Sequence, residues 1–484
     1  MRTATRSARL GLTAALTATV SAAMVVTGAP TAAAAPGDWT QVSQTSSAST
    51  YPEIGNIAEP TMARFGGTLQ VLWPQKASTS AEGYATALID ANGRVTTGPA
   101  PVFGDWSAVT KNPTLISLGG QRFLSFSGLN PGRSGAQYFA TSGDGLSWSV
   151  SPGSMSETQS AYAAYGSDAI DNAGTPVWVG NAGSTSGIRW HVGTSDANPA
   201  PAGTDQQYSL GGCCAYNAAA ARDDATGVVY AAFFSNSSAT TEKGIQVGRI
   251  LPAPAAFSQA PGSVTTNEYG TNASDPDQQV AMATRAGGGV YVAYKMGYPS
   301  PKQIRILRVD TGATLDFPVS GNVRSISMGA DPAGRIWVVW NQNNQMRAVH
   351  TNRAGTQLGS IGSWGGPRGT STMWKTAAAG SDGGADVVVT ATTQSAINVW
   401  HTQILRTLSV TADPGSVRRS GRVEFRVTDA GDPVAGATVR FGSRTGRTDA
   451  AGTVTIQAPG SRAAVRVKVG KAGYNSNSAT VRVR

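Results

Sequence analysis

A short unit of sequence, a glycine-containing turn followed by an apolar strand, recurs seven times along this chain. In its clearest copy the turn Asp331–Gly334 precedes Arg335–Asn341, RIWVVWN. Pro and Gly suit the turn, and β-branched and aromatic residues suit a buried strand. The seven turn glycines are 46 to 61 residues apart: Gly67, Gly120, Gly174, Gly227, Gly288, Gly334 and Gly383. Seven near-equal units predict an all-β fold, a seven-bladed β-propeller with four strands per blade, because a β-sandwich has no reason to keep such a period.

The two ends of the chain differ from this repeat. Residues 1–34 combine Arg2, Arg6 and Arg9 with an apolar stretch and small residues, which indicates a secretory signal peptide. We therefore expect a secreted, extracellular protein whose mature chain starts near Ala35, with no membrane span. We expect the propeller to occupy 35–406 and a small β-sandwich to occupy 407–484, where strictly alternating strands replace the repeat.

Charge is concentrated in the last of these segments. The chain has a net charge of +10, and residues 407–484 alone hold 13 basic against 5 acidic residues, or +8. After removal of the signal peptide the propeller is left near −1. The basic tail is either a solvated face or a surface attracted to anionic wall polymers or acidic polysaccharide. No motif for nucleic-acid binding is present, so no nucleic-acid partner is expected.

The seventh repeat lacks a fourth strand, because its third strand, Ile397–Leu405, runs almost directly into the tail. A ring of blades must close or leave a bare edge. The strand-like segment Trp39–Val42 is predicted to supply the missing outer strand.

A motif in the second repeat carries a resemblance to a known family. Within TSGDGLSW, residues 141–148, the positions Ser142, Asp144, Gly145, Ser147 and Trp148 resemble the Asp-box of sialidase-like (BNR-repeat) propellers, Ser-x-Asp-x-Gly-x-Thr-Trp. One residue is missing between Asp and Gly, and Ser replaces Thr. The resemblance implies a structural turn away from the active face, in which the carboxylate accepts local backbone N–H groups.

The tail carries a second resemblance. Pro433–Val439 and Thr448–Gly452 are similar to bacterial Ig-like and carboxypeptidase-regulatory-like modules. That family implies a β-sandwich without chemistry of its own, here an accessory or anchoring module.

The two cysteines are adjacent, Cys213 and Cys214. In an exported protein we expect them to form a disulfide with each other, as a rigid turn or as a hydrophobic disc at a ligand site. The three histidines, His191, His350 and His401, all fall on third strands, which diverge from the axis. No metal site is therefore expected, and no cofactor is implied.

First strands, in contrast, converge around the central channel of a propeller. Counting back from each turn glycine places Glu59, Lys111, Tyr165, Tyr216, Gln279, Arg324 and Lys375 there. We take the axial face as the candidate ligand site, formed by Glu59, Lys111, Tyr165, Tyr216, Arg324 and Lys375, because loops at one end of a rigid scaffold usually carry function. Three basic residues against one acidic residue favour an acidic sugar.

Two functions fit these features, and no catalytic residue is assigned. The first is a monomeric protein that binds a glycan or cell-wall polymer. The second is an enzyme: a sialidase-like glycoside hydrolase or a lyase on an acidic polysaccharide. Sialidases use a Tyr–Glu pair, an Asp and three Arg, but the Arg-Ile-Pro motif of that family is replaced here by Ala58-Glu59-Pro60-Thr61. We rank binding above catalysis.

Overall fold

The computed structural model describes residues 35–43, 59–76, 81–109, 113–129, 137–151, 167–181, 187–193, 205–211, 215–265, 279–297, 300–393 and 396–484. The chain is all-β. Apart from one 3-10 turn at Ser263–Thr265, the regular elements in these ranges are strands. Among the described residues no helix is long and apolar enough to cross a membrane.

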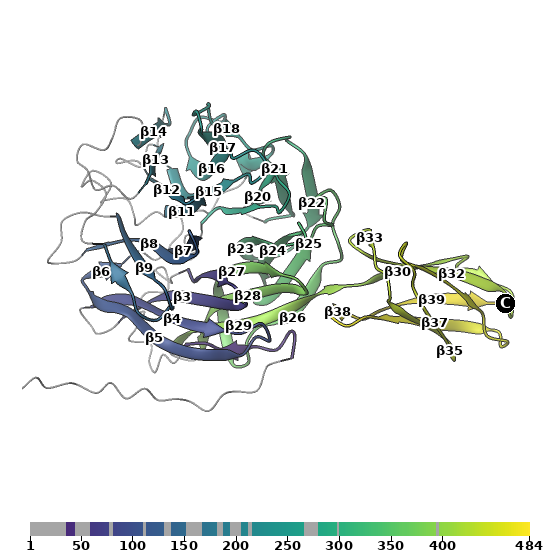
Figure 1. Ribbon diagram of the computed structural model, residues 1–484. Coiled ribbons are helices and arrows are strands. Elements are labelled where there is room, and N and C mark those ends of the chain that lie inside the picture. Colours follow the sequence, from purple (N-terminus) through teal and green to yellow (C-terminus); the bar gives the residue numbers. More distant parts are fainter. Residues whose placement is uncertain are drawn as a thin grey trace, which may run out of the picture.

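Between Thr40 and Thr407 the described strands form seven antiparallel sheets arranged like the blades of a β-propeller (Figure 1). The first three sheets are β2–β5 (Thr61–Phe65, Thr68–Lys76, Glu82–Ile89, Val95–Trp106), β7–β10 (Thr114–Leu118, Gln121–Leu129, Gln137–Ser142, Ser149–Val150) and β11–β14 (Ser167–Asn172, Thr175–Asn181, Gly187–Val192, Asp205–Ser209). A short strand, β6 (Ala108–Val109), also pairs with β8.

The remaining sheets continue in chain order. They are β15–β18 (Ala215–Arg222, Val229–Asn236, Lys243–Leu251, Ser258–Gln259), β19–β22 (Ala281–Thr284, Val290–Met296, Gln303–Arg308, Thr314–Pro318), β23–β26 (Val323–Ala330, Ile336–Gln342, Gln345–His350, Gly362–Gly365) and β27–β29 (Thr370–Ser381, Gly384–Thr393, Ala396–Thr407) with β1 (Thr40–Gln41). The apolar strands predicted from the repeat fall in β3, β8, β12, β16, β20, β24 and β28.

The first strands of consecutive sheets contact one another in a closed order. Strand β2 contacts β7, and each further first strand contacts the next in the order β7, β11, β15, β19, β23, β27. Strand β27 in turn contacts β2. The buried apolar clusters lie between consecutive sheets. Phe317 of β22, for example, packs on Trp340 of β24 with ring centroids 5.0 Å apart. Each sheet is thus apolar on both faces and buries them against its two neighbours.

The ring closes as the sequence predicts. β1 pairs antiparallel with β29, and Thr40 lies opposite His401. The backbone N–H of Val42 donates to Val399 O at 2.8 Å, and the Val42 side chain is buried. At the same seam Asp386 of β28 contacts both Arg64 of the first sheet and His401 Nε2, the latter at 2.8 Å.

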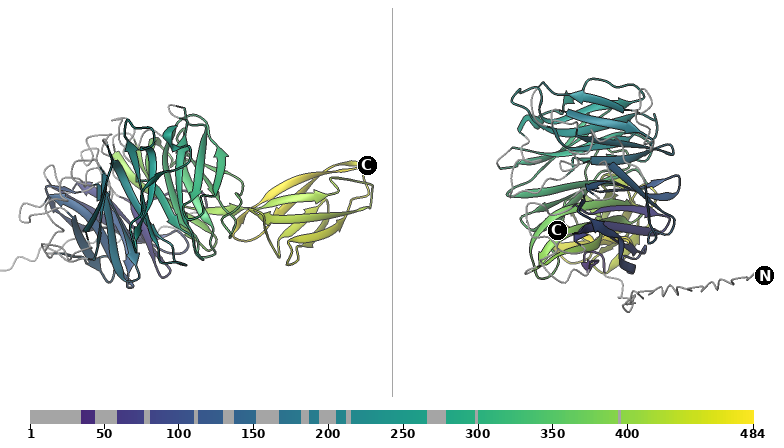
Figure 2. Two further views of the ribbon diagram at one scale, coloured as in Figure 1. Left: turned by 90° about the horizontal axis from the view of Figure 1, so that it is seen from above. Right: turned by 90° about the vertical axis from the view of Figure 1, so that its left-hand side faces the viewer.

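Residues from Ser409 onward form a separate unit that projects from one end of the ring (Figures 1 and 2). One sheet contains β30 (Ser409–Asp413), β32 (Arg422–Asp429), β33 (Asp432–Pro433) and β36 (Thr453–Gln457). The other has the order β31 (Ser416–Val417), β39 (Asn477–Val483), β37 (Ala463–Gly470), β34 (Thr438–Phe441), β35 (Arg444–Arg447). Both sheets contribute to one core, in which Phe425 and Phe441 pack edge to face.

A buried ionic cluster joins this unit to the ring. Asp429, at the end of β32, lies 3.3 Å from Arg335, 3.2 Å from His350 Nε2 and 3.3 Å from Arg406. Burial lowers the pKa of His350, while the charge of Asp429 acts in the opposite direction. His350 is therefore part of the interface between the ring and this unit, through its contact with Asp429. Strand β38 (Tyr474–Asn475) adds a short parallel pairing with β29 to the same interface.

Candidate functional site

A cavity of about 260 Å³ lies inside the ring and is lined by the first strands of all seven sheets. Its lining residues are Glu59, Pro60, Thr61, Met62, Pro113, Thr114, Leu115, Ile116, Asp168, Ala169, Ile170, Ala219, Ala220, Gln279, Val280, Ala281, Met282, Ile326, Ser327, Met328, Thr376, Ala377 and Ala378. Because first strands are the ones that approach one another, this cavity is where residues distant in the sequence combine.

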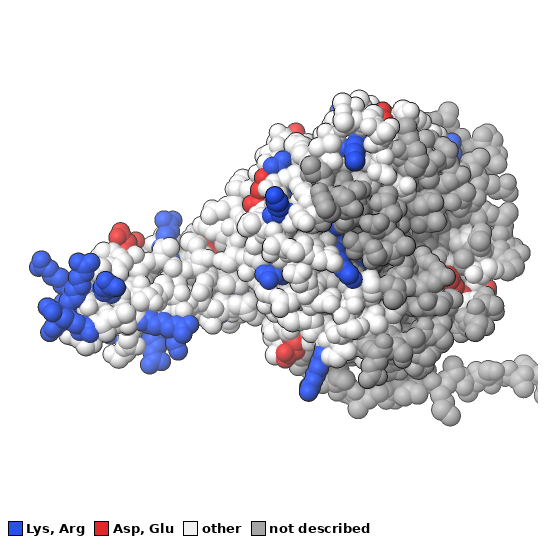
Figure 3. Space-filling model, turned by 180° about the vertical axis from the view of Figure 1, so that it is seen from behind, with Lys and Arg blue, Asp and Glu red and all other residues white. Residues whose placement is uncertain are grey.

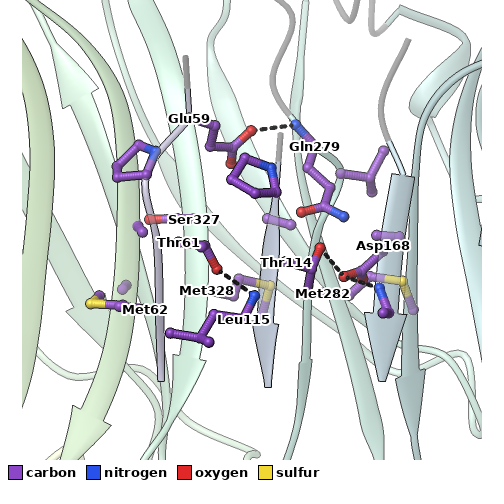
Figure 4. A pocket seen from close by; sticks show the side chains of 18 of the residues that line it. Glu59, Thr61, Met62, Thr114, Leu115, Asp168, Gln279, Met282, Ser327 and Met328 are labelled. Carbon is purple, nitrogen blue, oxygen red and sulfur yellow. Dashed lines mark hydrogen bonds between the residues drawn. The ribbon is translucent and has the colours of Figure 1, made fainter. Parts of the chain in front are cut away.

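Glu59 and Gln279, which stand just before β2 and β19, form the polar end of the cavity, which we call its mouth (Figure 4). The backbone N–H of Gln279 donates to Glu59 Oε2 at 3.1 Å. The Gln279 side-chain amide donates to the carbonyls of Ser167 and Ala218, each at 3.2 Å. One glutamine thus holds a carboxylate and two neighbouring first strands in a fixed arrangement.

Asp168 of β11 is the second carboxylate on the cavity wall. Its Oδ1 accepts hydrogen bonds from Thr114 Oγ1 at 3.1 Å and from the N–H of Ala169 at 2.8 Å. Its Oδ2 accepts from the N–H of Ala220 at 2.9 Å. Burial raises the pKa of Asp168 to about 6, and these hydrogen bonds oppose that rise. Desolvation is the larger effect, so part of the Asp168 population is protonated in mildly acidic solution.

Deeper in the cavity the lining becomes apolar. Met62, Met282 and Met328 line it together with alanine and isoleucine side chains (Figure 4). Polar side chains at this level bond to the neighbouring strand: Thr61 Oγ1 accepts from the N–H of Leu115 at 3.1 Å. The wall therefore offers hydrogen-bonding groups at the mouth and adaptable apolar surface below.

The structure brings some of the predicted site residues to the cavity wall and leaves others away from it. Glu59 lines the cavity. Tyr216, Arg324 and Lys375 do not, although each stands on a first strand. Tyr216 stacks on Phe234, Arg324 lies over the Trp374 ring at 5.1 Å, and Lys375 is buried.

A β-bulge explains each of these three positions. The pairing register shifts between Tyr216 and Ala219 in β15, between Val323 and Ile326 in β23, and between Met373 and Thr376 in β27. A bulge inserts an extra residue and re-aims the side chains on either side. The cavity is accordingly lined by the residues that follow each bulge.

Lys111, Tyr165, Cys213 and Cys214 lie outside the described residues. Their predicted roles, including the disulfide between Cys213 and Cys214, remain predictions. The axial ligand site as a whole also remains a prediction, now centred on Glu59 and Gln279.

Sequence reasoning missed Asp168. Counting back from the turn glycine Gly174 reached Tyr165, three residues too early. The available signal was the alternation in Ser167–Asn172, SDAIDN, where an acidic residue occupies a position flanked by small and apolar residues on a first strand.

The Asp144 turn forms as its chemistry predicts. Asp144 Oδ1 accepts from the N–H groups of Leu146 and Ser147, both at 2.8 Å, and Gly145 has φ of +85°. The Trp148 indole donates to Gly145 O at 3.1 Å. These hydrogen bonds hold the pKa of Asp144 well below its usual range. The Asp144 carboxylate therefore has a structural role, because it accepts the backbone N–H groups of the turn.

No group of three or more His, Cys, Asp or Glu side chains that would hold a metal ion occurs among the described residues. His401 is bound to Asp386, and His350 belongs to the interface with the C-terminal unit.

No protein-family model matches this sequence, and no curated protein matches it either. Among solved structures the chain is similar to the α-L-arabinofuranosidase Arb93A of Fusarium graminearum: 9% identity, 61% of this chain, 93% of that chain, TM-score 0.39. It is also similar to a puromycin-hydrolysing peptidase of Mycobacterium tuberculosis (13%, 82%, 62%, TM-score 0.41) and to the Aleuria aurantia lectin in complex with α-methyl-L-fucoside (11%, 84%, 97%, TM-score 0.33). The fold and the site described above rest on the sheets and contacts of this chain alone.

Proposed function

We propose that this chain is an exported glycan-binding protein, a seven-bladed β-propeller of the sialidase-like kind that carries a C-terminal Ig-like β-sandwich as an accessory module. Its ligand enters the axial mouth at Glu59 and Gln279. The seven sheets, the closed order of first strands and the shared core of the C-terminal sheets support the architecture. The basic, apolar and small-residue segments of residues 1–34 support export.

The single observation that carries the binding proposal is the two-part lining of the cavity. A carboxylate and an amide stand at the mouth, and methionine side chains lie below them. A saccharide has hydroxyl groups at its edges and C–H groups on its ring faces, so it matches both parts. Ligand pockets commonly measure ~300–1,000 Å³. The 260 Å³ cavity therefore suits one sugar unit of a longer chain.

The charge of this lining favours a neutral saccharide over the acidic sugar expected from sequence. The ionisable residues on the described wall are Glu59 and Asp168, both acidic. Arg324 and Lys375, which supported an acidic ligand, are absent from that wall. A carboxylate-bearing sugar would be repelled by Glu59.

Binding ranks ahead of catalysis because Asp168 is committed to the scaffold. It accepts hydrogen bonds from three groups on three first strands, which orders the wall. The Asp168 carboxylate therefore positions the neighbouring first strands, and its hydrogen bonds to them limit the directions from which a substrate could reach it.

A second candidate, glycoside hydrolysis, is favoured by one specific observation. The pKa of Asp168 is raised to about 6 by burial, which is the property of a general acid. Glu59 would be the second carboxylate that such a reaction requires.

The test is a screen of the secreted protein against a panel of neutral and acidic polysaccharides, in which retention and product release are both measured. Retention of a neutral glycan without release supports the binding protein. Release of sugars that Asp168→Asn abolishes supports the hydrolase. Intact mass of the secreted protein tests export, with cleavage expected near Ala35.

A further inference from the structure

One face of the C-terminal unit is basic without any compensating acid. In the sheet β31-β39-β37-β34-β35, Arg440, Arg466, Lys468 and Arg482 are exposed, while the residues between them, such as Val467 and Val481, are buried in the core. Successive side chains of a strand point to opposite faces, so the four cations share the outer face. None of the five strands of this sheet contains an Asp or Glu. We call these four residues the basic face.

Two cations of the basic face stand directly opposite each other. Arg440 of β34 and Lys468 of β37 are cross-strand partners in the antiparallel register. Like charges in this arrangement destabilise a sheet. The hydrogen bonds of the face do not relieve the repulsion: Arg440 Nε donates to Gly442 O, and Arg466 Nε donates to Ser478 Oγ. Across 396–484, where every residue is described, no ion pair involves these four side chains.

The other sheet of the C-terminal unit does not share the uncompensated positive charge of the basic face. On β32 the exposed residues alternate in charge: Arg422, Glu424 and Arg426. Each cation there has an acidic neighbour two residues away on the same face. The net charge of the unit is therefore gathered on one sheet, and Lys and Arg dominate the C-terminal unit in the view of Figure 3.

A shallow groove lies beside the like-charge pair of the basic face. Its volume is about 480 Å³, and it is lined by Thr438, Arg440, Lys468, Val469, Gly470, Lys471, Ala472 and Ser476. Lys471 Nζ donates to Ala435 O at 2.8 Å, which fixes its ammonium group beside the groove. The groove thus brings a third cation to Arg440 and Lys468 and adds two hydroxyl groups.

We propose that the basic face binds an acidic polysaccharide, with its negative groups over Arg440, Lys468, Lys471 and Arg466. Arg466 and Lys468 of β37 lie two residues apart, ~6.6 Å, on the same face, which suits two charged groups of a linear polymer. Thr438 and Ser476 offer hydroxyl groups to sugar hydroxyls. The repulsion between Arg440 and Lys468 is relieved when an anion lies between them.

The basic face lacks the exposed aromatic and apolar side chains that would favour a nucleic acid or a lipid surface as its partner. Within 407–484 the aromatic residues are Phe425 and Phe441, which are buried, and Tyr474, which is half-buried beneath Arg406. No ring is exposed on which nucleic-acid bases could stack. The exposed large apolar residues of the described chain, Val264 and Ile361, lie outside this unit, so nothing anchors it in a lipid surface.

The experiment measures binding of the full-length secreted protein to immobilised polygalacturonate at low and at moderate salt. Lys468→Glu places a carboxylate opposite Arg440. We expect it to weaken binding at least tenfold while the melting temperature stays the same or rises, because a like-charge pair becomes an opposite-charge pair. Arg426→Glu makes the same charge change on the other sheet and should alter binding less than twofold. Parent binding should fall steeply with salt.

Equal losses in Lys468→Glu and Arg426→Glu would overturn the proposal, since net charge alone would then explain binding. Unchanged binding in Lys468→Glu would also overturn it. Tighter binding of duplex DNA or of anionic phospholipid vesicles than of polygalacturonate would assign the face to another partner. The axial site is tested separately, on neutral saccharides, which carry no charge for the basic face to bind, so the two proposals fail independently.

Discussion

The backbone N–H of Gln279 donates a 3.1 Å hydrogen bond to Glu59 Oε2, although the two residues are 220 positions apart in the sequence. Glu59 precedes the first strand of the first sheet, and Gln279 precedes that of the fifth. The bond therefore links non-adjacent sheets of the ring across the axial mouth. A carboxylate held in this way is pre-organised for a ligand, because little side-chain freedom is left to lose on binding.

The raised pKa of Asp168 predicts a specific pH dependence of stability. The folded-state pKa, about 6, lies above the unfolded value near 3.8, so the folded protein binds more protons between these values. This group therefore adds stability as the pH falls from 7 toward 4. Melting temperatures of the parent and Asp168→Asn at pH 7 and pH 5 should show that increment in the parent only. Equal pH dependence in both proteins would contradict the assignment.

Asp429 is predicted to be essential for the interface between the ring and the C-terminal unit. Its removal leaves His350 and Arg406 buried without this anion, and leaves Arg335 with Asp331 and Asp432, each at 3.5 Å. Loss of one partner from a buried ionic cluster costs about 3–5 kcal/mol. Asp429→Asn should therefore lower the free energy of unfolding by that order in denaturant titrations, and Asp413→Asn, at an exposed position, should change it by less than about 0.5 kcal/mol. A loss below about 1 kcal/mol for Asp429→Asn would show that the cluster is dispensable.

Ring closure by β1 should make a measurable contribution to stability. Deletion of residues 36–43 exposes the edge of β29 and removes the buried Val42 side chain. We expect a lower and less cooperative melting transition, read by circular dichroism. An unchanged transition would mean that the ring does not need this strand.

Asp144→Ala separates turn stability from ligand binding. The variant loses the acceptor for the N–H groups of Leu146 and Ser147, so its melting temperature should fall. Affinity for any axial ligand should stay within twofold of the parent at a temperature where both are folded. A selective loss of affinity without loss of stability would place Asp144 in the binding site.

The sequence predicts the ring better than it predicts the wall of the cavity, for a physical reason. Turn glycines and β-branched strands are local signals, and the missing fourth strand of the last repeat points directly to Trp39–Val42. Side-chain direction on first strands depends instead on bulges near Tyr216, Arg324 and Lys375, which no residue type marks. Each bulge changes which residues face the axis. Asp168 was missed for a different reason: the register of its strand is regular, and counting back from Gly174 reached Tyr165, three residues too early.

The most direct test of an axial glycan site is to fill the cavity and repeat the glycan screen. Ala377 of β27 lines the cavity and is half-buried, so Ala377→Phe places a ring inside it. Ala451→Phe, at an exposed turn of the C-terminal unit, is the matched control. Both variants and the parent are applied to one array of neutral saccharides. We predict that the parent and Ala451→Phe retain the same saccharide and that Ala377→Phe binds it at least tenfold more weakly with an unchanged fold. Equal binding by Ala377→Phe, or no binding by the parent, would contradict the account.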